Sequence, residues 1–157
     1  MGKINLGRVI MGGIVAGVII DVVEYVLNGI VLADRWNAVA AAHNLPPFTS
    51  NAIILFNIIG LVTGIAAVWT YAAIRSRFGE GPGTAVTAAL LTWVVGYFLP
   101  DAGNAVMGIF PASLTVIIAA VGLVEIVVAT LAGAFIYRES GAGRDVASEK
   151  QVTGAAA

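Results

Sequence analysis

Four long apolar stretches alternate with short polar segments along the chain. They lie at about 8–32, 51–74, 84–99 and 113–137. A helix needs about 20 mostly apolar residues to cross the hydrocarbon of a bilayer, and lipid requires that backbone polar groups pair within the segment. Strands would need alternation with a period of two, which these stretches lack. The pattern predicts an all-α polytopic membrane protein, a bundle of four transmembrane helices over 1–137.

The polar segments between and after these helices carry predictions of their own. Residues 34–43 favour a short helix on the outer membrane surface. Residues 101–110 favour a short interfacial segment, because Pro100 disfavours helical geometry at the residue before it; a kinked end of the third helix is the alternative. Residues 138–157 are polar and rich in small side chains, so we expect a disordered cytoplasmic tail.

Composition supports a membrane protein and argues against other classes. Of the 157 residues, 59% are hydrophobic and 11% are charged, whereas soluble domains usually carry about 25% charged residues. The chain has no cysteine, which excludes disulfides and thiolate metal sites. The net charge of −1 and the lack of a basic stripe argue against a nucleic-acid partner.

The distribution of positive charge predicts the orientation. With the N-terminus inside, the outer segments hold only Arg35 among the lysines and arginines. Cytoplasmic segments of membrane proteins carry an excess of Lys and Arg, so we expect both termini in the cytoplasm of a bacterial inner-membrane protein. The residues on the predicted inner side are Lys3, Arg8, Arg75, Arg77, Arg138, Arg144 and Lys150.

The first apolar stretch contains two carboxylates and an amide where lipid cannot solvate them. Gly13, Gly17, Asp21, Glu24 and Asn28 follow one another at spacings of three or four residues, which places them on one face of a helix. Ionisable side chains in a membrane helix face the bundle interior and mark candidate functional sites. This face must therefore point toward protein or water.

The second and fourth helices each have a similar face. In the second it holds Asn57, Gly60 and Gly64, and in the fourth it holds Gly122 and Glu125. Small residues one turn apart let membrane helices approach closely. The residues that we expect to serve in helix packing are Gly13, Gly17, Gly60, Gly64 and Gly122.

The depth of the acids follows from the helical rise. At about 1.5 Å per residue, Asp21 lies roughly 20 Å and Glu24 roughly 24 Å from Arg8 at the inner surface. On the same rise, Glu125 lies roughly 21 Å from Pro111 at the outer surface. Asp21 and Glu125 should therefore lie near mid-membrane, with Glu24 in the outer half.

A shared pocket of these acids is the candidate site, with Asp21, Glu24, Asn28, Asn57 and Glu125 as predicted proton- or cation-binding residues. The predicted membrane interior offers them no Lys, Arg or His, and an ionised carboxylate buried without a partner is very unfavourable. Three interpretations remain: protonated acids with a structural role, a bound cation, or a water-filled cavity. The identity of any metal is left open.

Two pairs of similar segments suggest an internal repeat. Residues 22–28, VVEYVLN, align with 94–100, VVGYFLP, and 60–74 align with 122–136. A duplication would give two tandem helical hairpins related by an axis along the membrane normal. Chance similarity between apolar segments explains the match equally well.

Intramembrane carboxylates are typical of proton relays, so the first functional hypothesis is a small carrier or channel with a proton or cation site. Four short helices with a carboxylate on the first resemble the small multidrug resistance transporters. The longer outer loop, the second acid of the first helix and Glu125 depart from that family, so its mechanism is not carried over. Residues 7–29, GRVIMGGIVAGVIIDVVEYVLNG, also resemble the start of small bacterial inner-membrane proteins of unassigned activity.

The alternative hypothesis is an accessory or assembly subunit of a larger membrane complex, with a structural polar stripe. The expected partners are the lipid bilayer and either a second copy of the chain or a larger complex. An enzyme is not expected, because His43 lies in the outer loop and the paired Glu-x-x-His motifs of di-iron bundles are missing. No cofactor is expected.

Overall fold

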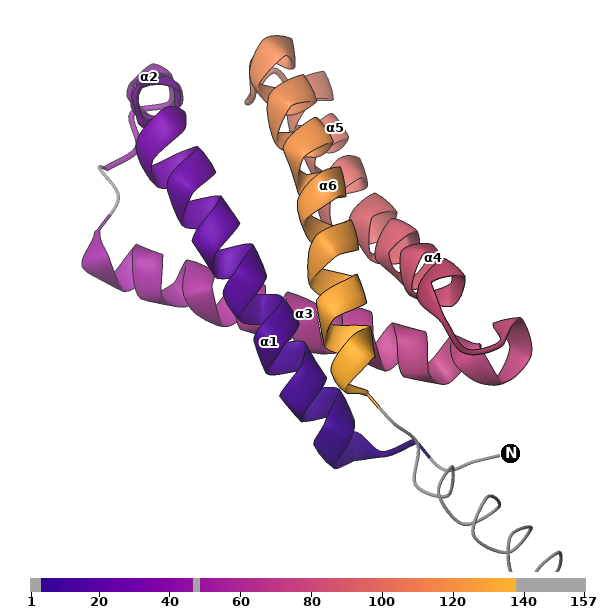
Figure 1. Cartoon of the computed structure of the whole chain (residues 1–157). Coiled ribbons are helices and arrows are strands. Elements are labelled where there is room, and N and C mark those ends of the chain that lie inside the picture. Colours follow the sequence, from indigo (N-terminus) through magenta and orange to yellow (C-terminus); the bar gives the residue numbers. More distant parts are fainter. Residues whose placement is uncertain (1–3, 47–48, 138–157) are drawn as a thin grey trace, which may run out of the picture.

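The computed structural model describes residues 4–46 and 49–137, and these residues form helices joined by short turns, without a strand (Figure 1). Two of the helical segments, η1 and η2, are π-helical. The elements are α1 (Leu6–Glu24), η1 (Tyr25–Val31), α2 (Ala33–Ala42), α3 (Ser50–Phe78), α4 (Pro82–Trp93), η2 (Val94–Phe98), α5 (Leu99–Val106) and α6 (Ala112–Ile136).

Four continuous helical stretches are long and apolar enough to cross a membrane. They are Leu6–Val31, Ser50–Phe78, Pro82–Val106 and Ala112–Ile136. The predicted four-helix membrane bundle is confirmed. The predicted tail at 138–157 lies outside the described residues.

We expected the third membrane-spanning helix to end before Pro100, with a kinked helix end as the alternative. The helix instead continues through the proline to Val106. A proline inside an α-helix meets the carbonyl four residues before it, here that of Gly96. The turn before Pro100 is π-helical, and the Leu99 N–H bonds to the Val94 carbonyl, five residues back. This wider turn gives the proline ring room, so the helix passes through it.

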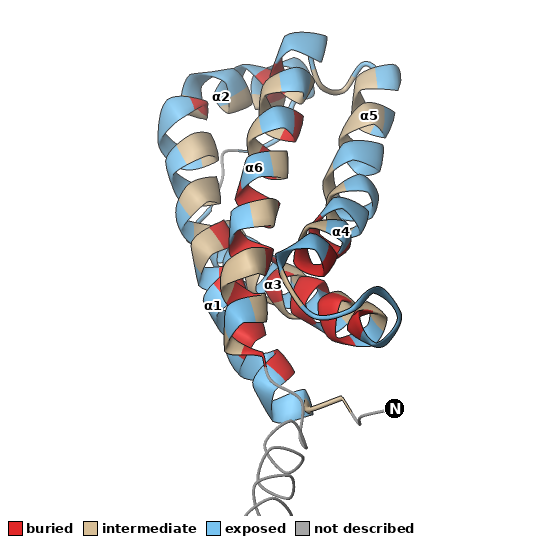
Figure 2. Cartoon of the chain, turned by 45° about the vertical axis from the view of Figure 1, so that its right-hand side comes forward, coloured by how far each residue is buried: buried red, intermediate tan, exposed pale blue. Residues whose placement is uncertain are grey.

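The bundle is tightly packed at one end and spread at the other. Figures 1 and 2 show α1, α4 and α6 gathered against α3 at one end. At the opposite end, where α2 lies, the first membrane-spanning helix and α5 are far apart. We call these the Arg75 end and the α2 end. Fully buried side chains concentrate near α3, and the largest of them include Val9, Ile20, Val68 and Ile126.

Glycines allow the closest helix contacts of this core. A Cβ on Gly64 of α3 would collide with the backbone of Gly13 and Gly17 on α1. Gly12 of α1 and Gly133 of α6 face each other in the same way, and a Cβ on either would collide with the carbonyl oxygen of the other. Helices that have no hydrophobic driving force between them in lipid gain from such close backbone packing.

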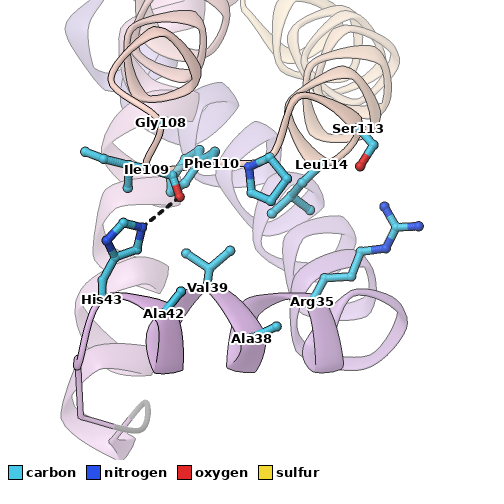
Figure 3. A pocket seen from close by; sticks show the side chains of 11 residues that line it. Arg35, Ala38, Val39, Ala42, His43, Gly108, Ile109, Phe110, Ser113 and Leu114 are labelled. Atoms are coloured by element: carbon cyan, nitrogen blue, oxygen red, sulfur yellow. Dashed lines mark hydrogen bonds between the residues drawn. The ribbon is translucent and has the colours of Figure 1, made fainter.

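At the α2 end, α2 follows η1 along the chain and packs against the start of α6. The prediction of a short helix at 34–43 agrees with α2 at Ala33–Ala42. The Trp36 ring meets Phe110 edge-on, with 5.1 Å between centroids, and His43 Nε2 lies 3.1 Å from the Ile109 carbonyl oxygen (Figure 3). Between α2 and the turn that joins α5 to α6 lies a mostly apolar cavity of about 580 Å³, with Arg35 at its edge.

At the Arg75 end, a buried arginine lies among aromatic rings. Arg75 is 6% exposed, pairs with Glu80 of the following turn, and lies 5.8 Å and 5.2 Å from the ring centroids of Tyr71 and Tyr137. Arginine over aromatic faces is attracted by the ring quadrupole. These contacts join the ends of α3 and α6 at this end of the bundle.

Candidate functional site

The candidate site lies midway along the bundle, where three membrane-spanning helices meet. Glu24 ends α1 and Asn28 follows in η1; Tyr97 belongs to η2 and Glu125 to the middle of α6. Glu125 is 3% exposed, whereas Glu24, Asn28 and Tyr97 are partly buried. The sequence places a polar residue in each helix, and the fold brings them together.

Each of the two glutamates accepts one hydrogen bond from a fixed neighbour. The Asn28 side-chain N–H donates to Glu24 Oε2, and the Tyr97 hydroxyl donates to Glu125 Oε1 over 3.0 Å. Trp36 of α2 donates from Nε1 to Asn28 Oδ1 over 2.8 Å, which fixes the direction in which the amide points. Each carboxyl is thus held in place by a hydrogen-bond donor of its own, Asn28 for Glu24 and Tyr97 for Glu125.

The two carboxyls also lie near each other. The Glu24 and Glu125 side chains are close enough to interact, and Glu125 Oε2 is buried with no donor among the described residues. A carboxylate only accepts hydrogen bonds, whereas a protonated carboxyl also donates one. One proton on either glutamate would therefore satisfy the oxygen that now lacks a donor.

A glycine on α6 explains how Tyr97 reaches Glu125. A Cβ on Gly122 would lie 2.9 Å from Tyr97 Cδ1, so the missing side chain lets the tyrosine ring lie flat against α6. Gly122 and Glu125 are three residues apart and therefore neighbours on the helix surface. The ring that packs on the glycine thus presents its hydroxyl to the carboxyl.

Asp21 lies beside this group but faces α3. A Cβ on Gly60 would collide with Asp21 Oδ1, so this carboxyl occupies the space that the glycine leaves. It is near enough to influence Glu24 and Glu125 electrostatically. Asp21 therefore adds negative charge to the surroundings of the pair.

Asn57, which we expected in the same pocket, lies apart from it. Its side chain is exposed and donates to the carbonyl of Ile53 in its own helix, 2.7 Å away. The first turns of α3 extend away from the helices that carry the acids (Figure 1). Of the predicted site residues, the structure joins Glu24, Asn28 and Glu125, with Asp21 alongside.

Three residues that we did not predict belong to the site or adjoin it. Tyr97 and Trp36 donate hydrogen bonds within it, and Asp101 of α5 is near enough to Glu24 and Tyr97 to act on them electrostatically. The repeat offered a clue to Tyr97, since it is the one polar residue of VVGYFLP. Nothing in the spacing distinguished Trp36 from an ordinary interfacial tryptophan.

The donor set suits a proton better than a metal ion. Among the described residues, no group of three or more His, Cys, Asp or Glu side chains is arranged to hold a metal. Two neighbouring carboxyls with one hydrogen-bond donor each, and one buried oxygen without a donor, match the requirements of a shared proton.

Comparisons with protein-family models, with curated proteins and with solved structures found no match to this chain. The class of the protein therefore follows from its own helices, which are those of a multi-pass membrane protein with a four-helix bundle.

Proposed function

We propose that this protein is a small carrier or channel in a bacterial inner membrane, and that its coupling site is the carboxyl pair Glu24 and Glu125. The observation that carries the proposal is the buried Glu125 Oε2, which lacks a donor among the described residues and belongs to a carboxyl close enough to Glu24 to interact with it. A buried polar atom without a partner costs stability. A site that binds and releases a proton accounts for this cost.

The pair would work by holding one proton and exchanging it. With one proton present, the two carboxyls bond to each other and carry a single negative charge. After the proton leaves, two like charges face each other in a medium that screens poorly. This repulsion would favour separation of α1 and α6, or entry of a cationic solute, and either event links proton release to transport.

The accessory-subunit alternative has one observation in its favour. Asn57 exposes an amide on a membrane-spanning helix, about 10 Å along the axis from Ser50 at 1.5 Å per residue. Lipid offers such a group no hydrogen bond, whereas a partner helix could. In this interpretation α3 would pack against another subunit, and the acid pair would have a structural role.

The test is proton flux in vesicles that contain the purified protein and an internal pH dye. We expect a pH step to dissipate faster than in empty vesicles, and Glu24→Gln and Glu125→Gln each to reduce the added rate to the background. Asp34→Asn is the matched control, because Asp34 is an exposed acid in the first turn of α2, and it should leave the rate unchanged.

Two outcomes would overturn the proposal. Flux that persists in both glutamine variants would show that the pair takes no part in it. Vesicles of the folded protein that conduct no protons at all would favour the subunit alternative, and the Asn57 face of α3 would then be the place to look for a partner by cross-linking.

A further inference from the structure

We infer that Asp101 passes protons between the α2 end of the bundle and the Glu24–Glu125 pair, and that this conformation is closed toward the Arg75 end. The inference rests on the proposed function and adds the route by which its site is reached. It draws on the placement of Asp101, on the spread of the helices at one end and on the dense packing at the other.

Asp101 lies one turn beyond Tyr97 on the same membrane-spanning helix. Residues four apart share a helix face, so the Asp101 carboxyl follows the hydroxyl that bonds to Glu125. It is near enough to Glu24 to act on it electrostatically and is itself partly exposed. Asp101 therefore lies between the buried pair and the surface of the α2 end.

The usual structural role of an acid at this position does not explain Asp101. It is in the first turn of α5, where a carboxylate often caps free backbone N–H groups. Here α5 continues directly from η2, and Phe98 before it makes no side-chain cap. The Asp101 side chain makes no hydrogen bond or ion pair within the described residues.

The bundle is uncovered on the side where Asp101 lies. At the α2 end, α2 joins η1 to the start of α6 through Leu32, Val39 and Leu114. α5 receives no such cover: Gly103 and Val106 are exposed, and Figure 2 shows α5 apart from α2. The apolar cluster that α2 forms includes no residue of α5, so α2 leaves the helix that carries Asp101 uncovered.

The path from the pair to the Arg75 end is blocked by packed side chains. Along α6, between Glu125 and the Arg75 end, the side chains of Ile126, Ala129 and Thr130 are fully buried. Val68 of α3 is fully buried as well. The glycine contacts between α1, α3 and α6 leave no space for a further methyl group. A site open to one side and closed to the other is the arrangement that an alternating-access carrier requires.

The first test compares water access to the two sides of the pair. Because the natural chain has no cysteine, a single cysteine can be introduced without background. In lipid nanodiscs, where both ends are accessible, we expect a charged thiol reagent to label Asp101→Cys at least about tenfold faster than Thr130→Cys, since labelling follows exposure. Equal rates, or faster labelling at 130, would overturn the closed end.

The second test separates Asp101 from the pair itself. The carboxyl infrared bands of the protein in nanodiscs are followed after a rapid pH jump. Asp101→Asn should slow the response of the Glu24–Glu125 bands by about tenfold or more, as expected when a proton-transfer group is removed, and leave their final amplitude unchanged. Asp34→Asn is the control and should leave both unchanged.

The outcomes of this second test are distinct. If the bands of the wild-type pair do not respond to pH, the proposed function fails. If they respond and Asp101→Asn leaves the rate unchanged, the pair remains a proton site and the role of Asp101 is wrong. A lost amplitude in Asp101→Asn would make the residue part of the site rather than a route to it.

Discussion

The two halves of the chain share a backbone design but carry different polar groups. In each half an α-helix, α1 or α4, changes to a π-helical segment within the repeated sequence, VVEYVLN or VVGYFLP. A long helix, α3 or α6, then packs against it. Under the alignment the two π-helical segments overlap at only two positions, residues 25–26 and 97–98, and the duplication stays a hypothesis.

The difference between the halves lies in what the equivalent positions hold. Glu24 aligns with Gly96, and Glu125 aligns with Thr63. The first half thus contributes one acid of the pair and the second half the other. The comparison teaches that one site can be divided between two similar hairpins when each supplies one carboxyl of the pair from a different helix.

The equivalent tyrosines show the same division. Tyr25 is 61% exposed, whereas Tyr97 packs on Gly122 and bonds to Glu125. Gly60, which aligns with Gly122, receives the Asp21 carboxyl in place of a ring. Only the second half has turned its tyrosine toward the acids.

The largest effect is expected where the helices of the two halves depend on glycine in different ways. Gly64→Ala should destabilise the protein by about 3 kcal/mol, because the new methyl group would collide with the α1 backbone. Gly96→Ala meets nothing within 4 Å and should be neutral or stabilising by up to about 1 kcal/mol. Thermal unfolding in one detergent compares the two, and equal losses would contradict the packing described.

A smaller effect is expected from the two tyrosine hydroxyls. Tyr97→Phe removes the donor to Glu125 Oε1 and leaves a buried carboxyl without a fixed donor, which should cost about 1–3 kcal/mol. Tyr25→Phe should change stability by less than about 0.5 kcal/mol, as exposed substitutions usually do. Unfolding curves that match for the two variants would remove Tyr97 from the site.

The tryptophans give a sharper spectroscopic comparison. Trp36→Phe removes the bond to Asn28, so the amide loses a partner and should reorient, with a shift of the carboxyl infrared bands and a loss of about 1 kcal/mol. Trp93 of the second half donates to the Ala119 carbonyl over 2.9 Å. Trp93→Phe should cost a similar amount and leave the carboxyl bands in place.

The smallest effect is expected at Thr130, on α6 beyond the pair. Its hydroxyl is fully buried and has no partner among the described residues. Thr130→Val removes that polar atom at nearly constant volume and should stabilise the protein by about 1 kcal/mol. A loss of stability would mean that the hydroxyl makes a hydrogen bond after all, for example through a buried water molecule.

Much of the fold was predictable because membrane helices follow simple rules of length and polarity. The four spans and the short helix α2 come from apolar runs and the breaks between them. The continuation of the third helix through Pro100 was only the less favoured alternative, because proline statistics describe an ordinary α-helix and say nothing of a π-helical segment before it.

The site was predictable only in part. Spacing on one helix grouped Glu24 with Asp21 and Asn28, whereas the estimated depths placed Asp21, and not Glu24, level with Glu125. The polar face of the second helix also suggested Asn57, but the direction in which a side chain points depends on helix crossing, and the start of α3 extends away from the acids. Tyr97 depends on its contact with Gly122, which connects two segments far apart in the sequence.

The most direct test of the account is the number of protons that Glu24 and Glu125 hold together at neutral pH. Infrared spectra of the protein in lipid nanodiscs, with each glutamate replaced by glutamine singly and then both together, give that number. We predict that the pair holds one protonated carboxyl and one carboxylate and gives a single-proton response to pH. The contributions of both groups to the spectrum should be lost in the double variant. Two carboxyls that stay protonated at every pH would contradict the account and make the pair a structural element.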